Sequence, residues 1–319
     1  MEARHLRYAL ALAEHQHFGR AAASLGIAQP PLSSQIAAVE REVGERLFDR
    51  TRRGVFPTAA GTAFLERARR ALDEMGAAMM DAGRAARGET GLLRLGFIGS
   101  ALLDPLPGVL GRFRRARPDV RLDLGEMSSP DGTAALIAGG LDVAVGRGGP
   151  RGPGAEGLVT VPIGSDELIA VVAATHPFAG RRAIGLGQLA AENLIVSPPD
   201  QEPAVAARLR SLFDSAPSPL DCATTSRDIH TTVGLAACGV GVGLGPARMR
   251  RLERGGIWFC EVTPRVRLPD LRLSFRAADR SPVLAAFLDV VRANCREVGS
   301  RLDDVLARHP AVRGIEQPG

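Results

Sequence analysis

Apolar positions recur with helical spacing between residues 18 and 43. They fall into two groups, which indicates two short helices on a common core: Ala21, Ala22 and Leu25 in the first, and Leu32, Ile36, Val39 and Val43 in the second. Gly26 separates the groups, where a tight turn favours a positive φ. Pro30 and Pro31 suit the first turn of the second helix, because a missing N–H costs no bond there. The pattern therefore predicts a helix-turn-helix.

The second helix of this pair is predicted to present a small polar surface to DNA. A turn of about 100° per residue places short polar side chains opposite the apolar face and at the helix start. An unbulky N-terminal turn of this kind is what a recognition helix offers to base edges in a major groove. The competing interpretation is an ordinary helical hairpin in a core. The residues expected to contact DNA are Gln29, Pro30, Ser33 and Ser34.

A basic segment follows directly after the helix pair. Two short strand-like pieces, Arg46–Phe48 and Val55–Phe56, flank a turn at Gly54, which predicts a β-wing. Arginines on such a wing would meet phosphates or the minor groove beside the recognition helix. We expect residues 1–58 to form a winged helix-turn-helix domain. The wing arginines are Arg50, Arg52 and Arg53.

Residues 59–88 read as one long helix with Thr58 as its N-cap. One apolar stripe runs along it, through Phe64, Ala68, Leu72, Met75, Met79 and Ala82. A small winged domain offers too little surface to cover this stripe. We therefore expect the same helix of a second chain to cover it, which gives a dimer that addresses a two-fold operator. A rigid spacer between domains is the alternative.

Short apolar strands alternate with helices after residue 91, which predicts parallel sheets of the α/β class. Residues 92–163 form one set, residues 164–266 form a second, and residues 267–300 return to the first. The region 89–319 is thus expected to be a two-lobed α/β domain like a periplasmic binding protein, with its ligand between the lobes. The complete prediction is a mainly α-helical winged domain, a linker helix and this effector domain.

Several polar residues follow predicted strands where that architecture places a ligand. Hydroxyl groups and free N–H groups at helix N-termini bind carboxylates, and an arginine adds charge. A small anionic effector is therefore expected. The structural alternative is that the hydroxyls are helix caps and that the arginine pairs with an internal acid. The candidate residues are Ser100, Ser128, Ser129, Arg147, Ser197, Thr225 and His230.

The motifs AxxLGIAQPPLSSQI, LFDRTRRGV and PTAAG within residues 4–72 resemble those of LysR-type transcriptional regulators. The AQPPLS variant, with GFIGSA, EM and GR later in the chain, resembles the branch that controls aromatic-compound catabolism, including muconate- and benzoate-responsive regulators. Two segments depart from the pattern. Many relatives carry Arg or Lys where this chain has Ser34, and SPPDQEP replaces the loop expected beside the cleft.

The resemblance implies a ligand-responsive activator of a catabolic operon that binds double-stranded DNA. It also implies a homo-oligomer, with a dimer through the linker helix, a tetramer built from it, and RNA polymerase as a further partner. In relatives the positions that match Ser100, Ser128 and Arg147 line the effector cleft. The effector implied is an aromatic acid or a muconate-like dicarboxylate.

Composition adds limits to this picture. The chain has 319 residues, 45% of them hydrophobic, which suffices for two or three domains with cores. A formal charge of +5 is mild, so DNA affinity must come from placed charges rather than from a strong overall field. No signal peptide is apparent, and the longest apolar run, near 168–174, is too short to span a bilayer. We expect a cytoplasmic protein without membrane contact.

Other functions receive less support from the sequence. Cys222 and Cys238 are the candidates for a thiol-based redox sensor, although Cys238 lies in the apolar segment GLAACG, typical of an inert core cysteine. The four cysteines show no CxxC pair, so neither a metal nor a cofactor is expected. A solute-binding protein would need an export signal and has no use for residues 1–58. No catalytic motif suggests an enzyme.

Overall fold

The computed structural model describes residues 1–214, 218–221 and 223–295. The chain divides into two compact units, Met1–Arg84 and a second unit that begins at Ala85. Each unit is described by itself below. No helix in the described part of the chain combines the length and the apolar character that crossing a membrane requires.

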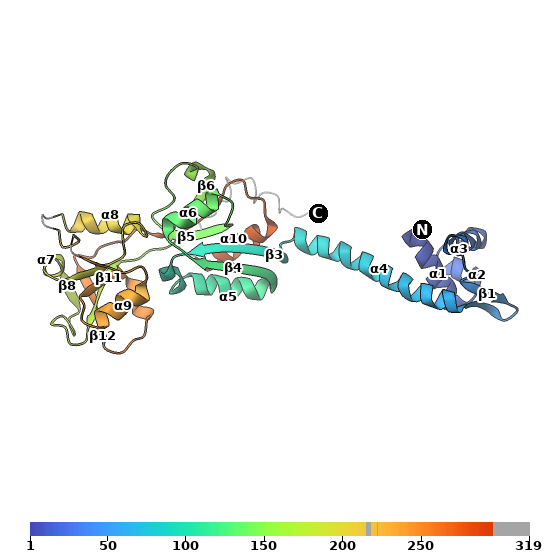
Figure 1. Cartoon of the computed structure of the whole chain (residues 1–319), viewed down its shortest axis with the longest axis horizontal. Coiled ribbons are helices and arrows are strands. Elements are labelled where there is room, and N and C mark those ends of the chain that lie inside the picture. Colours follow the sequence, from blue (N-terminus) through green and yellow to red (C-terminus); the bar gives the residue numbers. More distant parts are fainter. Residues whose placement is uncertain (215–217, 222, 296–319) are drawn as a thin grey trace. The chain divides into compact units, whose positions relative to one another are not determined.

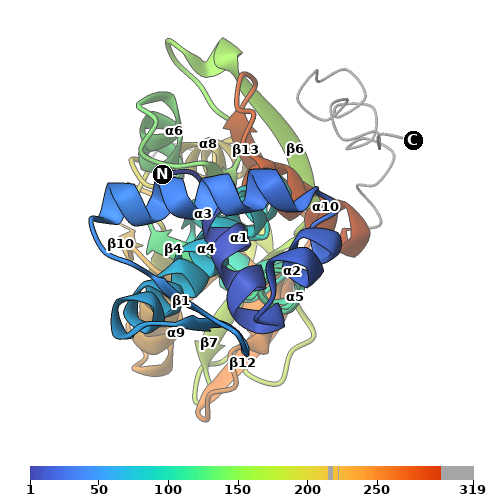
Figure 2. The ribbon, with the colours of Figure 1, turned by 90° about the vertical axis from the view of Figure 1, so that its right-hand side faces the viewer.

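Three helices and a two-stranded hairpin form the start of the first unit (Figure 2). Leu32, Ile36 and Val39 are buried in its core as predicted, whereas Val43 at the last turn is 39% exposed. Gly26 has a φ of +67°, so the predicted tight turn is confirmed. The elements are α1 (Ala3–His15), α2 (Phe18–Ser24), α3 (Gln29–Val43), β1 (Phe48–Thr51) and β2 (Gly54–Pro57).

The hairpin lies further along the chain than the sequence suggested. The predicted first strand ended at Phe48, but β1 begins there and includes Arg50, while Arg52 and Arg53 form the turn. The error has a local cause. Phe48 is only 2% exposed and was read as the end of an apolar strand, but it starts the strand by anchoring it to the core.

A single long helix, α4 (Ala59–Ala86), follows the hairpin. Its N-cap is the predicted one, because the Thr58 hydroxyl accepts the Gly61 N–H at 2.9 Å. Leu65 and Ala68 are buried against the winged domain, but Met75 and Met79 are 49% and 80% exposed. The C-terminal half of the predicted apolar stripe, which includes Met75 and Met79, is therefore exposed to solvent in the described part of the single chain.

The second unit begins with a five-stranded sheet in the order β4-β3-β5-β13-β6 (Figure 1). We call this sheet and its helices lobe I. Helices α5 and α10 share a core with one face of the sheet, where the Phe113 and Phe287 rings meet edge to face, and α6 covers the other face. The elements are β3 (Thr90–Phe97), η1 (Gly99–Leu102), α5 (Leu106–Ala116), β4 (Asp119–Glu126), α6 (Ser129–Ile137), β5 (Val143–Arg147), η2 (Ala155–Gly157), β6 (Leu158–Gly164), β13 (Leu271–Arg276) and α10 (Pro282–Asn294).

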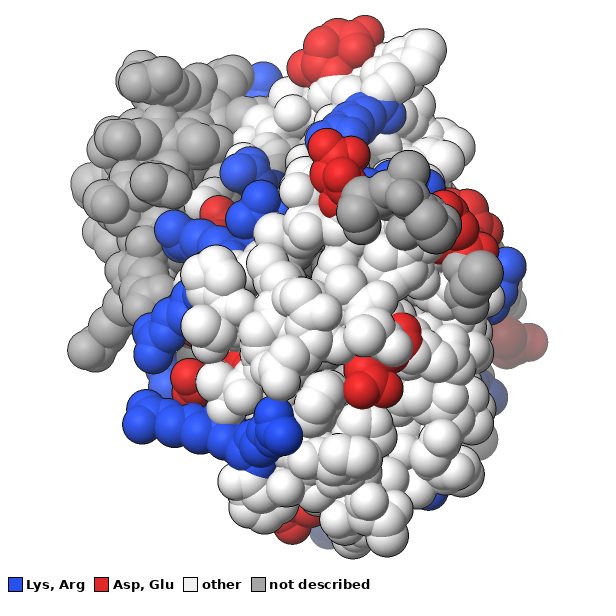
Figure 3. Space-filling view, turned by 90° about the vertical axis from the view of Figure 1, so that its left-hand side faces the viewer, with Lys and Arg blue, Asp and Glu red and all other residues white. Residues whose placement is uncertain are grey.

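A six-stranded sheet in the order β10-β9-β11-β7-β12-β8 forms lobe II. Figure 3 shows that the outer end of this lobe carries mostly uncharged side chains. The chain passes between the lobes twice, at residues 164–168 and 263–271. The elements are β7 (Leu168–Ala173), β8 (Ala183–Gly185), α7 (Leu186–Leu189), β9 (Leu194–Val196), α8 (Pro203–Leu212), β10 (Thr224–Thr225), α9 (Ile229–Ala237), β11 (Val242–Pro246), η3 (Ala247–Arg251) and β12 (Ile257–Thr263).

Both sheets are mixed rather than parallel, which corrects the sequence-based expectation. In lobe I the returning strand β13 runs antiparallel to β5 and β6. In lobe II β7 runs antiparallel to β11 and β12. In both lobes an antiparallel neighbour is a strand that adjoins an interlobe crossing. The crossings therefore interrupt the parallel βαβ pattern that the local sequence indicates.

Candidate DNA interface and effector cleft

The N-terminal turn of α3 offers the small polar surface that the sequence predicted. Gln29, Pro30 and Ser34 are exposed, and Ser33 is half-buried beside them. The Ser34 hydroxyl donates to the Pro31 carbonyl at 3.3 Å, so the helix itself holds this side chain. The exposure of these side chains leaves room for an approach to base edges.

Hydrogen bonds hold the wing against α3 and against the end of α1. One carboxylate oxygen of Glu40, on α3, accepts the N–H groups of Leu47 and Phe48 at 2.9 and 3.1 Å. On the other strand, the Val55 N–H donates to the Gln16 carbonyl at 2.9 Å. These bonds place the hairpin turn at a fixed position relative to the recognition helix. Both would therefore reach DNA as one surface.

The three wing arginines are exposed, and two of them have no partner in the described structure. Arg50 lies over the Phe18 ring at 4.8 Å, which fixes its side chain. Arg52 and Arg53 form no ion pair with any described residue, so their charges remain available to phosphate. This arrangement supports the interpretation of the wing as a phosphate-binding element.

A cleft of about 390 Å³ lies between the two lobes. Four of the predicted effector residues line it: Ser100 and Ser128 from lobe I, Arg147 at the end of β5, and Ser197 after β9. Two others lie elsewhere. Thr225 lines a separate hollow on lobe II, and the exposed His230 lies in the first turn of α9 and lines none of the hollows described here.

Some hydroxyl groups in the cleft already form hydrogen bonds within the protein, and others do not. The Ser128 hydroxyl caps α6, accepting the Asp131 N–H at 3.1 Å and donating to its carboxylate at 2.7 Å. This agrees with the structural alternative for Ser128. The Ser100 and Ser197 hydroxyls bond to no described residue, although Ser100 is only 6% exposed. Both hydroxyls are therefore free to bond to a ligand in the cleft.

The guanidinium group of Arg147 is paired inside the protein. It donates to the Asp166 carboxylate at 2.6 Å and to the Pro269 carbonyl at 2.9 Å. Arg248 Nε donates to the same carboxylate oxygen, and burial lowers the pKa of Arg248. Two arginines thus share one buried acid beside the interlobe crossings. Arg147 was predicted to bind the ligand directly, but in the structure its guanidinium group pairs with Asp166.

Sequence reasoning missed Glu202, which lines the cleft and joins the two lobes. Its carboxylate accepts the hydroxyl of the predicted residue Ser129 at 3.0 Å, and that hydroxyl in turn accepts the Arg147 N–H at 3.0 Å. Burial raises the pKa of Glu202 to about 7, against the opposing effects of the Ser129 bond and the Arg147 charge. Ser129 therefore acts as an interlobe bridge and lies outside the lining of the cleft.

The cysteines do not assemble into a described thiol pair. Cys222 lies outside the described residues. Cys238 is exposed at the C-cap of α9, so its interpretation as a core cysteine is wrong. Cys260 and Cys295 are buried, and burial raises the pKa of both thiols. In the part of the chain that the structure describes, no group of three or more His, Cys, Asp or Glu side chains could hold a metal ion.

Comparison with known proteins matches these two units to named families. Residues 3–62 match the family described as bacterial regulatory helix-turn-helix protein, lysR family, and residues 86–296 match the LysR substrate binding domain. The regulator TfdS of Cupriavidus pinatubonensis is 36% identical over 92% of this chain and 98% of its own. BenM of Acinetobacter baylyi is 29% identical over 92% of this chain and 95% of its own.

Solved structures agree with the sequence relatives. The LysR family regulator CbnR, solved alone, covers 91% of this chain and 100% of its own with a TM-score of 0.79 and 31% identity. Full-length CbnR with its target DNA gives a TM-score of 0.80. A winged helix-turn-helix joined to a two-lobed substrate-binding domain defines a class of ligand-responsive transcriptional regulators, not of enzymes. The chain belongs to the LysR family of that class.

Proposed function

We propose that this protein binds a two-fold operator and activates a catabolic operon when a small carboxylate enters the interlobe cleft. The observation that carries the DNA part is the continuous surface of α3 and the wing, with Arg52 and Arg53 unpaired by any described residue. The relative CbnR has been solved with its target DNA, which supports the same use of the matching domain. A regulator of this kind works beside DNA, in the cytoplasm.

The effector is an aromatic acid or a muconate-like dicarboxylate. The resemblance to the aromatic-catabolism branch supports this choice, as do the free hydroxyls of Ser100 and Ser197. Because Arg147 and Arg248 share Asp166, this buried cluster beside the cleft carries one excess positive charge, which favours an anion nearby. Three acids, Glu126, Glu202 and Asp228, and two arginines, Arg147 and Arg227, line the cleft, so we expect the ligand's carboxylates to lie at the arginines and the free hydroxyls.

Ligand binding would act through the arrangement of the lobes. The cleft is lined from both lobes, so a ligand that contacts both favours the arrangement in which those contacts form. A tenfold change in that equilibrium requires about 1.4 kcal/mol of differential affinity. The Ser129–Glu202 bridge is part of the contact that such a change would alter.

The effector assignment is tested by calorimetry on the full chain with cis,cis-muconate and benzoate. We expect Ser100→Ala to weaken binding of the active ligand severalfold and to leave operator affinity without ligand unchanged. Ser211→Ala, at an exposed position of α8, is the matched control and should bind as the parent does. If neither acid binds the parent, or if Ser100→Ala binds equally tightly, the assignment of the cleft is wrong.

The same proposal includes a dimer through α4. Met75 and Met79 are exposed in the single chain, and a second copy of the helix would cover them. Replacing Leu72 and Met75 with Glu places like charges along that seam, so protection of a palindromic operator should shrink to half-sites or vanish. Ala77→Glu, on the other side of the helix, is the control. Unchanged two-fold protection in the double variant would make α4 a spacer.

A further inference from the structure

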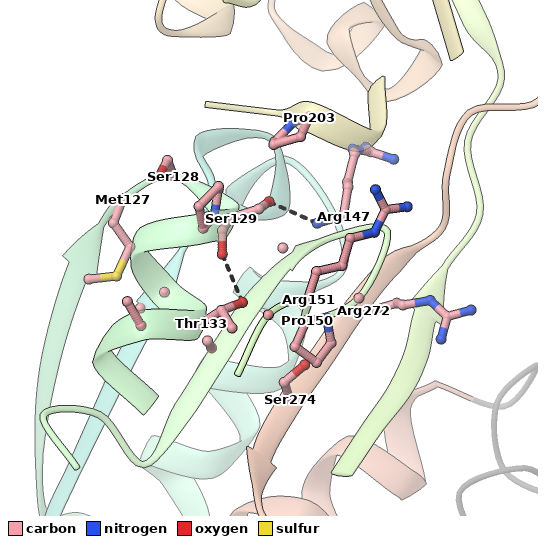
Figure 4. Close-up of a pocket in the computed structure, with 18 of the residues that line it drawn as sticks. Met127, Ser128, Ser129, Thr133, Arg147, Pro150, Arg151, Pro203, Arg272 and Ser274 are labelled. Atoms are coloured by element: carbon pink, nitrogen blue, oxygen red, sulfur yellow. Dashed lines mark hydrogen bonds between the residues drawn. The ribbon is translucent and has the colours of Figure 1, made fainter. Parts of the chain in front are cut away.

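The Glu202 carboxyl group is held at the wall of the interlobe cleft by contacts between the lobes. Both of its oxygens lie within bonding distance of the Ser129 hydroxyl, at 3.0 and 3.1 Å. The neighbouring Gln201 carbonyl accepts the Ser129 N–H at 3.3 Å. Figure 4 shows that the Ser129 hydroxyl also accepts the backbone N–H of Arg147, and it labels Pro203, the residue of α8 that follows Glu202. A ligand in the cleft would therefore meet a carboxyl group whose position is fixed.

The charges that line the cleft do not balance while Glu202 is ionised. Three acids, Glu126, Glu202 and Asp228, and two arginines, Arg147 and Arg227, form the charged part of its lining. Both arginines already have an acid close by, since Arg147 pairs with Asp166 and Arg227 lies 3.7 Å from Asp200. Three negative groups against two positive ones oppose the entry of a carboxylate. Loss of the charge on Glu202 brings the two counts level.

The other acids on the elements around the cleft have partners or water to stabilise their charge. The Asp228 carboxylate caps α9, where it accepts the Thr231 N–H at 2.8 Å and the Thr231 hydroxyl at 2.6 Å. Burial alone would raise the pKa of Asp228, but these bonds bring it below its ordinary value. Asp131 on α6 accepts a serine hydroxyl at 2.7 Å, and Glu126 is exposed to water. Burial instead raises the pKa of Glu202 to about 7, so Glu202 is the acid that gives up its charge most readily.

We propose that the cleft takes up its anionic effector together with one proton, which Glu202 holds. This inference rests on the proposed function, in which a carboxylate binds in this cleft. The proton comes from solvent and forms the O–H bond of the Glu202 carboxyl, and no other covalent bond changes. A ligand carboxylate nearby favours the protonated form, because like charges repel. A hydroxyl can accept from a neutral carboxyl as well as donate to an ionised one, so Ser129 can bond to Glu202 in both states.

Uptake of a proton makes the effector affinity depend on pH in a defined direction. Well below about pH 7, Glu202 is already neutral in the free protein, so ligand binding takes up almost no proton. Above that pH, the free protein must first gain a proton, and the affinity falls as pH rises. The expected loss is roughly tenfold between pH 6 and pH 8. Glu202 would thereby couple the response of the regulator to pH.

The test is calorimetry of the full chain with cis,cis-muconate and benzoate at about pH 5.5, 7 and 8. Each titration is run in two buffers that differ in ionisation enthalpy, because the difference in heat gives the number of protons taken up per ligand. The test variant is Glu202→Gln, which stays neutral throughout. Glu126→Gln, at the other glutamate of the cleft, is the matched control. His230→Gln removes a histidine near Asp228, because histidines titrate in this pH range.

We expect the parent to take up close to one proton per ligand at about pH 8 and almost none at about pH 5.5. Glu202→Gln should bind without proton uptake, and its affinity should vary by less than about twofold across the range. Both controls should behave as the parent does. Ser129→Ala removes a bond that opposes protonation of Glu202, so it should move the fall in affinity to higher pH.

Binding without proton uptake at about pH 8 overturns this inference and leaves the effector assignment standing. Uptake that persists in Glu202→Gln, or that disappears in either control, has the same consequence. A Glu202→Gln protein that unfolds cooperatively but binds neither acid also overturns it, because the amide is as neutral as the protonated acid. If the parent binds neither acid at any pH, the effector assignment is wrong, and this inference fails with it.

Discussion

The arginines of the wing and those of the interlobe region have opposite surroundings. Arg52 and Arg53 lie exposed on a two-residue turn and pair with no described residue. Arg147 and Arg248 are 3% and 6% exposed, and both donate to Asp166. One pair is available to a partner molecule as it stands, while the other is already used to hold the protein together.

Desolvation explains the difference. An exposed guanidinium keeps its hydration until a phosphate replaces it, so it needs no partner in the free protein. A buried guanidinium loses that hydration and requires an acid or carbonyl in the fold. Position at a predicted binding site is therefore a safer guide to function for an exposed arginine than for a buried one.

Removal of Asp166 should give the largest effect and tests the structural role of the buried arginines. Asp166→Asn leaves two buried guanidinium groups without their counter-charge. We expect the free energy of unfolding of the second unit to fall by about 3–5 kcal/mol. Denaturant unfolding measures this change. A loss below 1 kcal/mol would show that the cluster is hydrated and that Arg147 is available to a ligand.

The control for this experiment is an exposed acid that also pairs with an arginine. Asp289 lies 3.4 Å from Arg292 on α10, and both side chains are about half exposed. Solvent screens such a pair, so Asp289→Asn should change the free energy of unfolding by less than about 0.5 kcal/mol. The contrast between the two variants isolates burial as the cause.

The exposed arginines of the wing are expected to contribute to DNA binding and not to stability, in contrast to the buried arginines. Arg52→Ala/Arg53→Ala should leave stability unchanged, weaken binding to every DNA sequence, and reduce the slope of log affinity against log salt by roughly 1–2. Gln29→Ala should instead change sequence preference, by roughly 1–3 kcal/mol for a base pair it reads. Salt titrations on specific and random duplexes separate these effects. A slope unaltered by the double variant would remove the wing from the interface.

The DNA-facing surface could be read from the sequence because its residues are contiguous. The apolar spacing, Gly26 and the paired prolines each act within one or two helical turns, so local rules suffice. Thr58 as a cap is equally local. The hairpin was misplaced by a few residues because Phe48 anchors to a core whose other members, such as Leu12, come from distant helices.

The cleft could be predicted only in part because its polar groups are paired over long sequence separations. Arg147 is 19 residues from Asp166, and Arg248 is 82 residues from it. Nothing local to Asp166 indicates that it accepts from either arginine. Glu202 lies in the segment SPPDQEP, which departed from the resemblance, and that departure was the one signal that pointed to the bridge.

Titration of Glu202 should give the smallest effect and tests the bridge between the lobes. Its pKa is raised from 4.5 to about 7, so the folded protein favours the protonated acid. The stabilisation is complete below the unfolded pKa and is lost as pH rises through about 7. Relative to Glu202→Gln, which stays neutral, the parent should lose on the order of 2 kcal/mol between pH 5 and 8. Parallel unfolding curves for parent and variant across that range would show that the Glu202 carboxyl is solvated and that the bridge does not respond to pH.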